Sequence, residues 1–280
     1  GSTTGSTSQG AVSSTPTGLE VPFAFTRDNL PRLDGSTSTA PLARAMCAVL
    51  LGESEEEVSD RVEFSRTTQS YRNLMEGKAD LVLAAEPAPE VLEELEAGEK
   101  WLLTPFATDA LVFVVNRDNP VDSLTVEEIQ KIYTGEITNW REVGGADGEI
   151  ACIGREANSG TRDGFESITG TEDTCKLSQE LTSTGAVIEA VKNSPNAIGY
   201  ASLSAVEGKE GIKALTVNGV ACSEETVLDG SYEIQRPFVL VTRTGEALSP
   251  AAQAFFDFAT SSAANDLIKS AGAVPVAAAQ

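Results

Sequence analysis

A strand, a tight polar turn and a helix follow one another between residues 149 and 168, and this succession constrains the fold most strongly. Residues 149–154 form an apolar run, and the apolar positions after residue 163 return at helical spacing. Ser159 is a favourable helix N-cap, and Gly160 lets a ligand approach the backbone. Unpaired first-turn N–H groups suit an anion, and Arg155 adds a planar fork of donors. The alternative is an ordinary capped turn, with Arg155 in a surface salt bridge.

The same succession recurs nearer the N-terminus. A short extended piece runs into a Gly-Ser-Thr-Ser turn at residues 35–38, and Pro41 suits the first turn of a helix predicted over about 39–51. The apolar run at 80–84 is typical of a strand buried on both faces. Strand and helix alternation predicts a parallel α/β architecture, in which ligands gather at the carboxyl ends of strands. The polar residues expected at such ends are Ser36, Thr37, Ser38, Thr67 and Glu86.

Further elements are predicted from the same patterns. The strands are expected at about 61–64, 196–200 and 236–242, and the helices at about 68–75, 89–97, 123–129, 185–192, 250–259 and 263–270.

The composition excludes several classes of function. The chain has 20 Lys and Arg against 42 Asp and Glu, a formal net charge of −22, which disfavours nucleic acid and acidic membranes as partners. It contains no histidine, which removes Ser-His-Asp catalysis and most transition-metal sites. No apolar run approaches the length needed to span a bilayer. We therefore expect no catalytic group, metal or cofactor.

The four cysteines are widely spaced and contain no C-x-x-C pair, so zinc or iron–sulfur ligation is not expected. Cys47 falls in a helical apolar pattern and is expected to be a buried thiol. A single bridge among Cys152, Cys175 and Cys222 stays open, because spacing cannot choose a connectivity.

Residues 1–19 are nearly all Gly, Ser and Thr and are expected to form a flexible tether. The segment has no initiator Met, basic stretch or apolar stretch, so we expect any targeting signal to have been removed. Two interpretations stay open: a ragged terminus, or a spacer that lifts the protein off a cell-envelope surface.

Several motifs together resemble one family, the phosphate-binding receptor proteins of bacterial ABC-type phosphate uptake systems. The similarity covers nearly the whole chain after the tether, and each motif alone would be weak. The motifs are DGSTST at 34–39, GKAD at 77–80, VVNRDNPV at 114–121, IYTGEITNW at 132–140, R-x-x-x-SGT at 155–161, NAIGY at 196–200 and RPF at 236–238.

This resemblance implies a two-lobed periplasmic-binding-protein fold, an α/β architecture in which each lobe has a mixed, mostly parallel sheet with flanking helices. Two strands would cross between the lobes near residues 106–111 and 232–238. The first lobe would then comprise residues 20–107 and 234–280, and the second lobe residues 108–233.

The resemblance also implies a phosphate site. The acid that this family places after the strand at 80–84 is assigned to Glu86, with Asp80 as the less favoured choice because it begins that strand. A carboxylate can only accept a hydrogen bond, so it favours protonated phosphate over unprotonated sulfate. The family's usual partner of the arginine is replaced by Ala157, and Glu156 is the substitute at hand. The predicted contacts are Ser36, Thr37, Ser38, Thr67, Glu86, Arg155, Ser159, Gly160 and Thr161.

By the same resemblance, the protein would be a non-catalytic extracytoplasmic receptor that delivers inorganic phosphate to the transmembrane subunits of an ABC permease. It would be a monomer, either periplasmic or lipid-anchored through a removed N-terminal lipobox segment. Two alternatives stay open. One is a phosphate sensor or surface protein on the same fold. The other is a phosphate-ester hydrolase using Ser159 or Thr161, which lacks an evident base.

Overall fold

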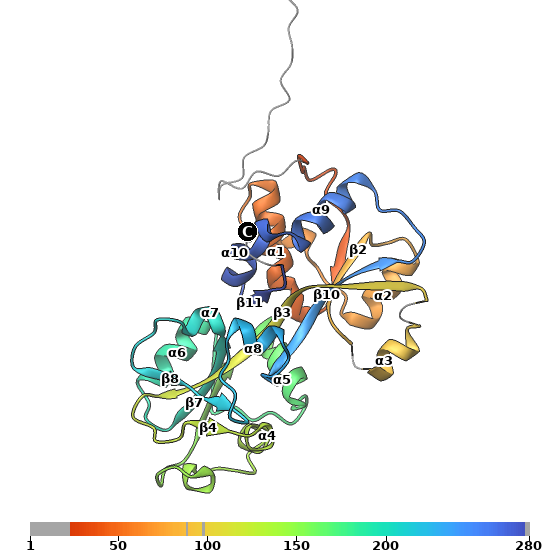
Figure 1. Ribbon diagram of the computed structural model, residues 1–280. Helices are drawn as coiled ribbons and strands as arrows, with labels where there is room; N and C mark the ends of the chain where they lie inside the picture. Colours follow the sequence, from red (N-terminus) through yellow and green to blue (C-terminus); the bar gives the residue numbers. More distant parts are fainter. Residues whose placement is uncertain (1–22, 88, 97–98, 278–280) are drawn as a thin grey trace, which may run out of the picture.

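The structure is a computed structural model that describes residues 23–87, 89–96 and 99–277. The predicted tether at 1–19 lies outside the described residues. Figure 1 shows two lobes joined by two long strands, β3 (Trp101–Asn116) and β10 (Gln235–Arg243). These strands pair antiparallel, from Gln235 opposite Ala110 to Arg243 opposite Trp101. The expected crossings at 106–111 and 232–238 thus fall within or beside this paired ribbon.

One lobe holds the N-terminal elements and the C-terminal helices (Figure 1). Its elements are β1 (Leu33–Gly35), η1 (Thr37–Thr39), α1 (Ala40–Leu51), η2 (Ser59–Arg61), α2 (Thr67–Met75), β2 (Leu81–Ala85), α3 (Pro89–Glu94), α9 (Pro250–Thr260), η4 (Ser262–Ala264), α10 (Asn265–Ser270) and β11 (Ala273–Pro275). The other lobe holds β4 (Ser123–Leu124), α4 (Val126–Tyr133), η3 (Trp140–Val143), β5 (Ala151–Arg155), α5 (Gly160–Thr169), β6 (Gln179–Leu181), α6 (Thr184–Lys192), β7 (Ala197–Ser202), α7 (Leu203–Val206), β8 (Ile212–Ala214), β9 (Thr216–Val217) and α8 (Glu224–Leu228).

The main sheet is mixed and continues from one lobe into the other. Its order is β1-β2-β10-β3-β7-β5-β6, with β8 and β11 also paired to β3. The pairs β1–β2, β5–β6 and β5–β7 are parallel, whereas every antiparallel pair between named strands includes β3 or β10. The α/β two-lobed fold with a mixed sheet is confirmed, but the expectation of mostly parallel strands is wrong, because β3 and β10 pair antiparallel with each of their neighbours. The lobe boundaries given above stay a prediction.

Each lobe has its own apolar core. In the N-terminal lobe, α1 packs Met46 and Cys47, both fully buried, against β2 and α9. The predicted buried thiol at Cys47 is confirmed, and burial raises its pKa to about 12. All four cysteines are free in the structure, so the bridge left open by the sequence is not formed here.

The core of the other lobe centres on Phe165, which lies on α5. Its ring stacks on Tyr200 with centroids 4.2 Å apart and meets Tyr133 edge-on at 4.7 Å. We expect Phe165→Ala to lower the free energy of unfolding by about 3–5 kcal/mol, because it removes a fully buried ring and leaves a cavity. Urea unfolding would measure this change, and a loss below about 1 kcal/mol would contradict the packing described.

One predicted strand is wrong. The segment at 61–64 begins in the single turn η2 and then runs without strand pairing. Side chains hold it instead: the Ser65 N–H donates to Asp34 Oδ1 at 2.7 Å, and Phe64 packs on the apolar core. The apolar alternation of Val62 and Phe64 therefore reflects core contact and not a place in the sheet.

Candidate anion-binding site between the lobes

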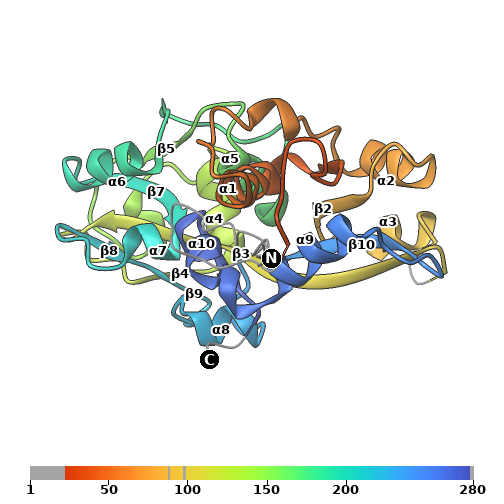
Figure 2. The same cartoon turned by 90° about the horizontal axis from the view of Figure 1, so that it is seen from above.

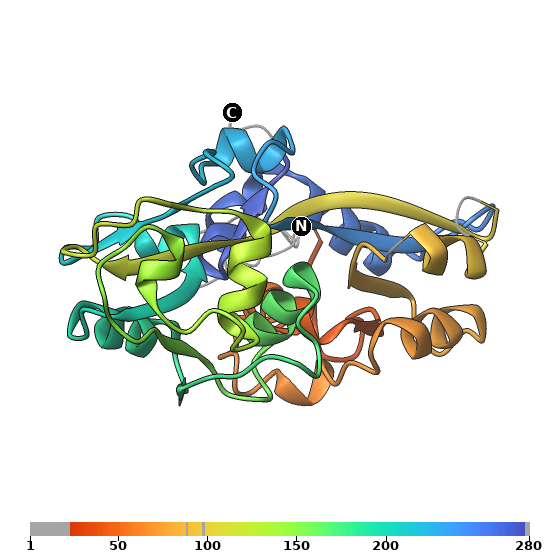
Figure 3. The same cartoon turned by 90° about the horizontal axis from the view of Figure 1, so that it is seen from below.

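The two donor-rich turns predicted from the sequence lie face to face. A Cβ placed on Gly160, the first residue of α5, would stand 3.0 Å from the Thr37 carbonyl oxygen and 3.1 Å from Pro41 Cγ. Figures 2 and 3 show α5 beside the start of α1 at the middle of the molecule. The turns at 36–38 and 155–161 therefore share one cleft, and a side chain at position 160 would crowd the point where they meet.

The first turn is fixed to the carboxyl end of β2. The buried Ser36 Oγ accepts the Ala85 N–H at 3.1 Å and lies 3.2 Å from both Ser38 Oγ and Thr39 Oγ1. Thr39 Oγ1 in turn donates to the Leu83 carbonyl at 2.6 Å. These bonds hold the backbone of the turn, so that Thr37 and Ser38 are presented to the cleft.

The second turn is fixed by Ser159 and Arg155. Ser159 Oγ accepts the Arg162 N–H at 3.3 Å, which confirms the predicted N-cap of α5. Arg155 Nε and Nη2 donate to the two carboxylate oxygens of Glu156 at 3.1 and 3.2 Å, and Nη1 donates to Thr184 Oγ1 at 3.1 Å. Glu156 thus supplies the carboxylate that the Ala157 position lacks, and Arg155 is held in one orientation.

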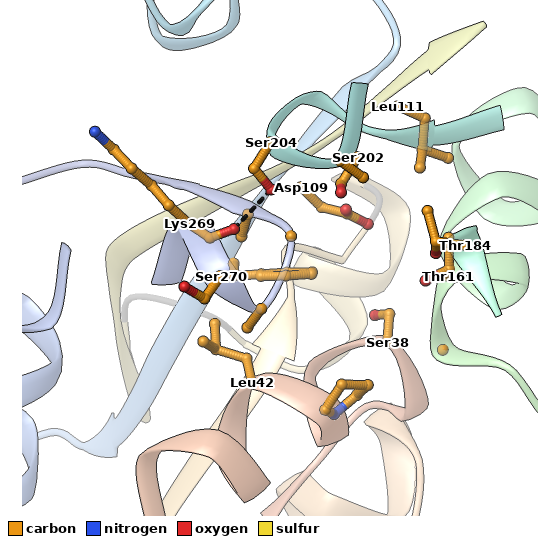
Figure 4. Close-up of a pocket in the computed structure, with 17 residues that line it drawn as sticks. Ser38, Leu42, Asp109, Leu111, Thr161, Thr184, Ser202, Ser204, Lys269 and Ser270 are labelled. Atoms are coloured by element: carbon orange, nitrogen blue, oxygen red, sulfur yellow. Dashed lines mark hydrogen bonds between the residues drawn. The ribbon is translucent and has the colours of Figure 1, made fainter. Parts of the chain in front are cut away.

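The contact between η1 and α5 has a cavity on each side. The larger cavity, of about 530 Å³, is lined by Ser38, Gly160 and Thr161 together with Asp109, Thr184 and Ser202 (Figure 4). The smaller, of about 420 Å³, is lined by Ser36, Thr37, Ser38 and Thr67 together with Asp163 and Arg236. Six of the nine predicted contacts therefore line one of these cavities, and Ser38 lines both.

The remaining three predicted residues lie near the cavities without lining them. Ser159 is buried beneath the α5 N-terminus, and Arg155 reaches the larger cavity through Thr184. Glu86 follows β2, where its N–H donates to the Pro237 carbonyl at 2.8 Å. Asp80 lies at the opposite end of β2 and pairs with Arg32 at 2.9 Å. Of the two candidate acids, only Glu86 is at the carboxyl end of the strand.

Sequence reasoning missed two charged residues of the crossing ribbon, Asp109 and Arg236. They stand directly opposite each other in the β3–β10 register. Asp109 lines the larger cavity, whereas Arg236 lines the smaller cavity and has a buried Nε without a partner. The signal in the sequence was a charged residue inside a long apolar strand. Burying a charge without a partner is energetically unfavourable, so such a residue indicates a role beyond packing.

The ionisation of Asp109 costs stability. Burial raises the pKa of this carboxyl from 3.8 to about 6, although the charge of Arg236 opposes the rise. The folded protein therefore holds the proton more tightly than the unfolded chain does. Stability should thus fall as the pH rises from about 4 to about 6, and the full penalty remains above that range.

We expect Asp109→Asn to raise the free energy of unfolding at pH 8 by on the order of 2 kcal/mol and to change it little near pH 4. This stabilisation is smaller than the free energy equivalent to the whole pKa shift of Asp109, because water in the cavity partly solvates the carboxylate. Urea unfolding at both pH values would measure the difference, with the exposed Asp257→Asn as control. Equal stabilisation at both pH values would contradict the argument.

Asp163 on α5 connects the two sides of the smaller cavity. Its pKa is raised by burial and by Glu166, while a hydrogen bond with Thr37 and the positive charge of Arg66 oppose the rise. Arg66, the N-cap of α2, has φ 74° and ψ 167°, a conformation that only glycine adopts without strain. Arg66 directly precedes the predicted ligand Thr67. Because such a strained backbone persists only where the surrounding fold holds it, tertiary contacts fix the position of Thr67 at the edge of the cleft.

The part of the chain that the structure describes shows neither a metal-binding cluster nor a membrane-spanning helix. In residues 23–87, 89–96 and 99–277, no group of three acidic or cysteine side chains lies close enough to hold a metal ion. Within the same ranges, no helix combines the length and the apolar character needed to cross a membrane.

The chain resembles known proteins over most of its length. The family model of the PBP superfamily domain matches residues 5–263. The phosphate-binding protein PstS of Borreliella burgdorferi is 33% identical over 190 residues, which are 64% of this chain and 67% of the relative.

Solved structures agree with these matches. An ABC-type phosphate transport receptor from Vibrio cholerae aligns with a TM-score of 0.69 and 28% identity, over 86% of this chain and 98% of the receptor. A Clostridium perfringens protein, described as a phosphate ABC transporter substrate-binding protein and solved with bound phosphate, aligns with a TM-score of 0.58 and 30% identity, over 87% and 98%. From the family model and the PstS relative together, this chain belongs to the PBP superfamily, among relatives that are PstS-type phosphate-binding proteins.

Proposed function

We propose that this protein is an extracytoplasmic solute-binding protein that captures inorganic phosphate between its two lobes and delivers it to an ABC permease. The observation that carries the proposal is the meeting of the two turns, with Thr37 of one lobe against Gly160 of the other. The names of the relatives support phosphate as the ligand.

The two turns supply the donors that an oxyanion needs. The N-terminus of α5 offers unpaired N–H groups and the positive end of a helix dipole, and Ser38 and Thr161 line the cavity beside it. Because the whole chain carries a formal charge of −22, long-range attraction cannot bring the anion in. Capture must depend on these short-range donors, together with the cation of Arg155.

Closure of the lobes would complete the site. A ligand held by both turns favours the closed state by the contacts that exist only there. The crossing ribbon of β3 and β10 is the connection about which the lobes would move, with lobe boundaries at 20–107 plus 234–280 and at 108–233. We propose that the protein acts as a monomer, in the periplasm or anchored by a lipid at its N-terminus.

A hydrolase on the same site is less well supported. Ser159 is buried and its Oγ already caps α5, so it is not free to attack an ester. The absence of histidine from the sequence removes the commonest base. A phosphate sensor on the same fold would share the ligand site and differ only in its partner.

Titration calorimetry with phosphate and with sulfate tests the proposal. We expect phosphate to bind and sulfate to bind far more weakly. Failure to bind phosphate, or equal binding of the two anions, would refute it. Release of colour from a chromogenic phosphate ester would instead support the hydrolase.

A further inference from the structure

The larger cavity between the lobes has more room than inorganic phosphate requires. Its volume is about 530 Å³, and residues of both lobes and of the crossing strand β3 line it. Pockets that hold organic molecules typically measure about 300–1,000 Å³, whereas one water molecule takes up only about 30 Å³ of the liquid. The cavity can therefore hold a phosphoryl group together with an organic substituent.

The two sides of this cavity differ in chemistry. Ser38 and Thr161 belong to the turns that would bind the anion, and Figure 4 shows them on one side, with Ser270 and Leu42 on the opposite side. The lining also includes the apolar residues Pro41, Leu111, Phe238, Ala271 and Ala273. Inorganic phosphate has no apolar group to place against these residues, whereas a short carbon chain would cover part of them.

A carboxylate without an ion-pair partner also faces the cavity. Asp109 lines it from β3, and Figure 4 shows the carboxylate pointing into the space between Ser202 and Ser38. Within the part of the chain that the structure describes, no salt bridge includes Asp109. Lys269 lines the cavity too, but its ammonium pairs with Glu224 at 3.0 Å. A cationic group on a ligand could therefore bind to Asp109.

Two other charged residues near the cleft are directed elsewhere. Arg236, opposite Asp109 on β10, donates to Ser167 Oγ and lines the smaller cavity. Alternation along β2 places Glu86 on the face that packs with Tyr71 of α2, and the charge of Glu86 contributes to the raised pKa of Tyr71. Of these three charged groups, only Asp109 lines the larger cavity.

The spacing along α5 indicates the length of a suitable ligand. The anion would bind at the first turn, which begins at Gly160, whereas a Cβ placed on Gly164 would stand 2.6 Å from Asp109 Oδ2. Four residues of an α-helix advance by about 6 Å. A chain of two carbon atoms between a phosphoryl group and an ammonium group bridges a comparable distance, so one ligand can reach both places.

We infer that the larger cavity binds a short aminoalkyl phosphate ester or phosphonate, with its phosphoryl group at the two turns and its ammonium group at Asp109. The inference rests on the proposed function, because the phosphoryl group would use the anion site described there. Esters and phosphonates share the phosphoryl group that the turns would bind. In this partly enclosed space the ammonium would form a charge-assisted hydrogen bond with Asp109, which favours such a ligand over one without a donor.

Titration calorimetry at pH 8 with four ligands tests the inference: inorganic phosphate, phosphoethanolamine, 2-aminoethylphosphonate and ethyl phosphate. We expect the wild type to bind at least one of the two amines about tenfold or more tightly than ethyl phosphate. Binding of only one amine would assign the ester or the phosphonate. If the wild type binds inorganic phosphate but neither amine, the inference is overturned and the proposed function stands. Binding of an amine without binding of inorganic phosphate would support the inference and refute inorganic phosphate as the ligand.

Asp109→Asn tests the contact with the ammonium group. We expect it to lower the affinity for the amine that the wild type binds by about tenfold, and to leave the affinity for ethyl phosphate within about twofold of wild type. The control is Asp257→Asn, at an exposed position of α9, which should bind both ligands like wild type. Equal losses for the amine and for ethyl phosphate in Asp109→Asn would show a structural role of Asp109 and overturn the inference.

Ala205→Leu tests the place of the carbon chain. Ala205 of α7 lines the larger cavity and is not among the predicted phosphate contacts, so a larger side chain there would take space from the substituent alone. We expect the affinity for the amine to fall about tenfold while inorganic phosphate binds like wild type. Ala146→Leu, at an exposed position of the same lobe, is the matched control. Full affinity for the amine in Ala205→Leu would contradict the inference.

Discussion

Replacing Arg155 by alanine is expected to weaken phosphate binding about a hundredfold or more while the protein stays folded. The guanidinium at the end of β5 bonds to Glu156 and Thr184 beside the larger cavity, and its side chain is 16% exposed. Removing it deletes a cation next to the proposed anion site and leaves the Glu156 carboxylate uncompensated. Truncating the protein's member of a buried charge pair between protein and ligand typically costs about 2–5 kcal/mol in binding free energy. Calorimetry would give the dissociation constant, and thermal unfolding would report the fold.

Two variants bracket this result. Arg155→Lys keeps the charge but not the planar fork, and should lie between wild type and alanine. Arg117→Ala, at an exposed position of the same lobe, should bind like wild type. An unchanged dissociation constant in Arg155→Ala would remove Arg155 from the site.

The second large effect is expected from Gly160→Val. Its side chain would enter the contact between α5 and η1, where even a Cβ stands 3.0 Å from the Thr37 carbonyl oxygen. Overpacking at such a point costs about 1–3 kcal/mol, and the lobes can avoid this cost by staying apart. A ligand that requires both turns would then bind up to about a hundredfold more weakly. Small-angle scattering with saturating phosphate should show a more open molecule than wild type.

Gly185→Ala is the matched control for this substitution. Gly185 lies in the first turn of α6, and no neighbouring atom lies within 4 Å of the place that an added methyl group would take. This variant should bind phosphate like wild type. Full affinity in Gly160→Val would mean that closure at this contact is not needed for binding.

Local chemistry made much of the candidate site predictable from the sequence. Ser159 could be recognised as an N-cap, and the helix that it begins is α5 at Gly160–Thr169. The turn at 35–38 followed by Pro41 likewise indicated the position of α1. Such features can be predicted from the sequence because a cap or a turn depends on residues only a few positions apart.

The pairing of strands that lie far apart in the chain could be predicted only in part. A crossing strand was expected only near 106–111, yet β3 runs through Trp101–Asn116. Pro105 did not end this strand, because the register shifts between Phe238 and Val239 of β10 just where Pro105 pairs. Whether a strand continues through a proline therefore depends on a partner strand more than a hundred residues away in the chain.

The sequence by itself determined the alternation of strands and helices, the two donor-rich turns and the acidity that confines anion capture to short range, since each follows from local pattern or composition. The two-lobed arrangement was expected from the resemblance of the motifs to a known family. The tertiary structure decided which polar groups share a cavity. Asp109 and Arg236 come together only through the β3–β10 pairing, and Glu86 is assigned to the α2 face only by the alternation of β2 between two cores. The direction of a side chain depends on which strand lies alongside and which core claims each face, and these contacts are not local in the chain.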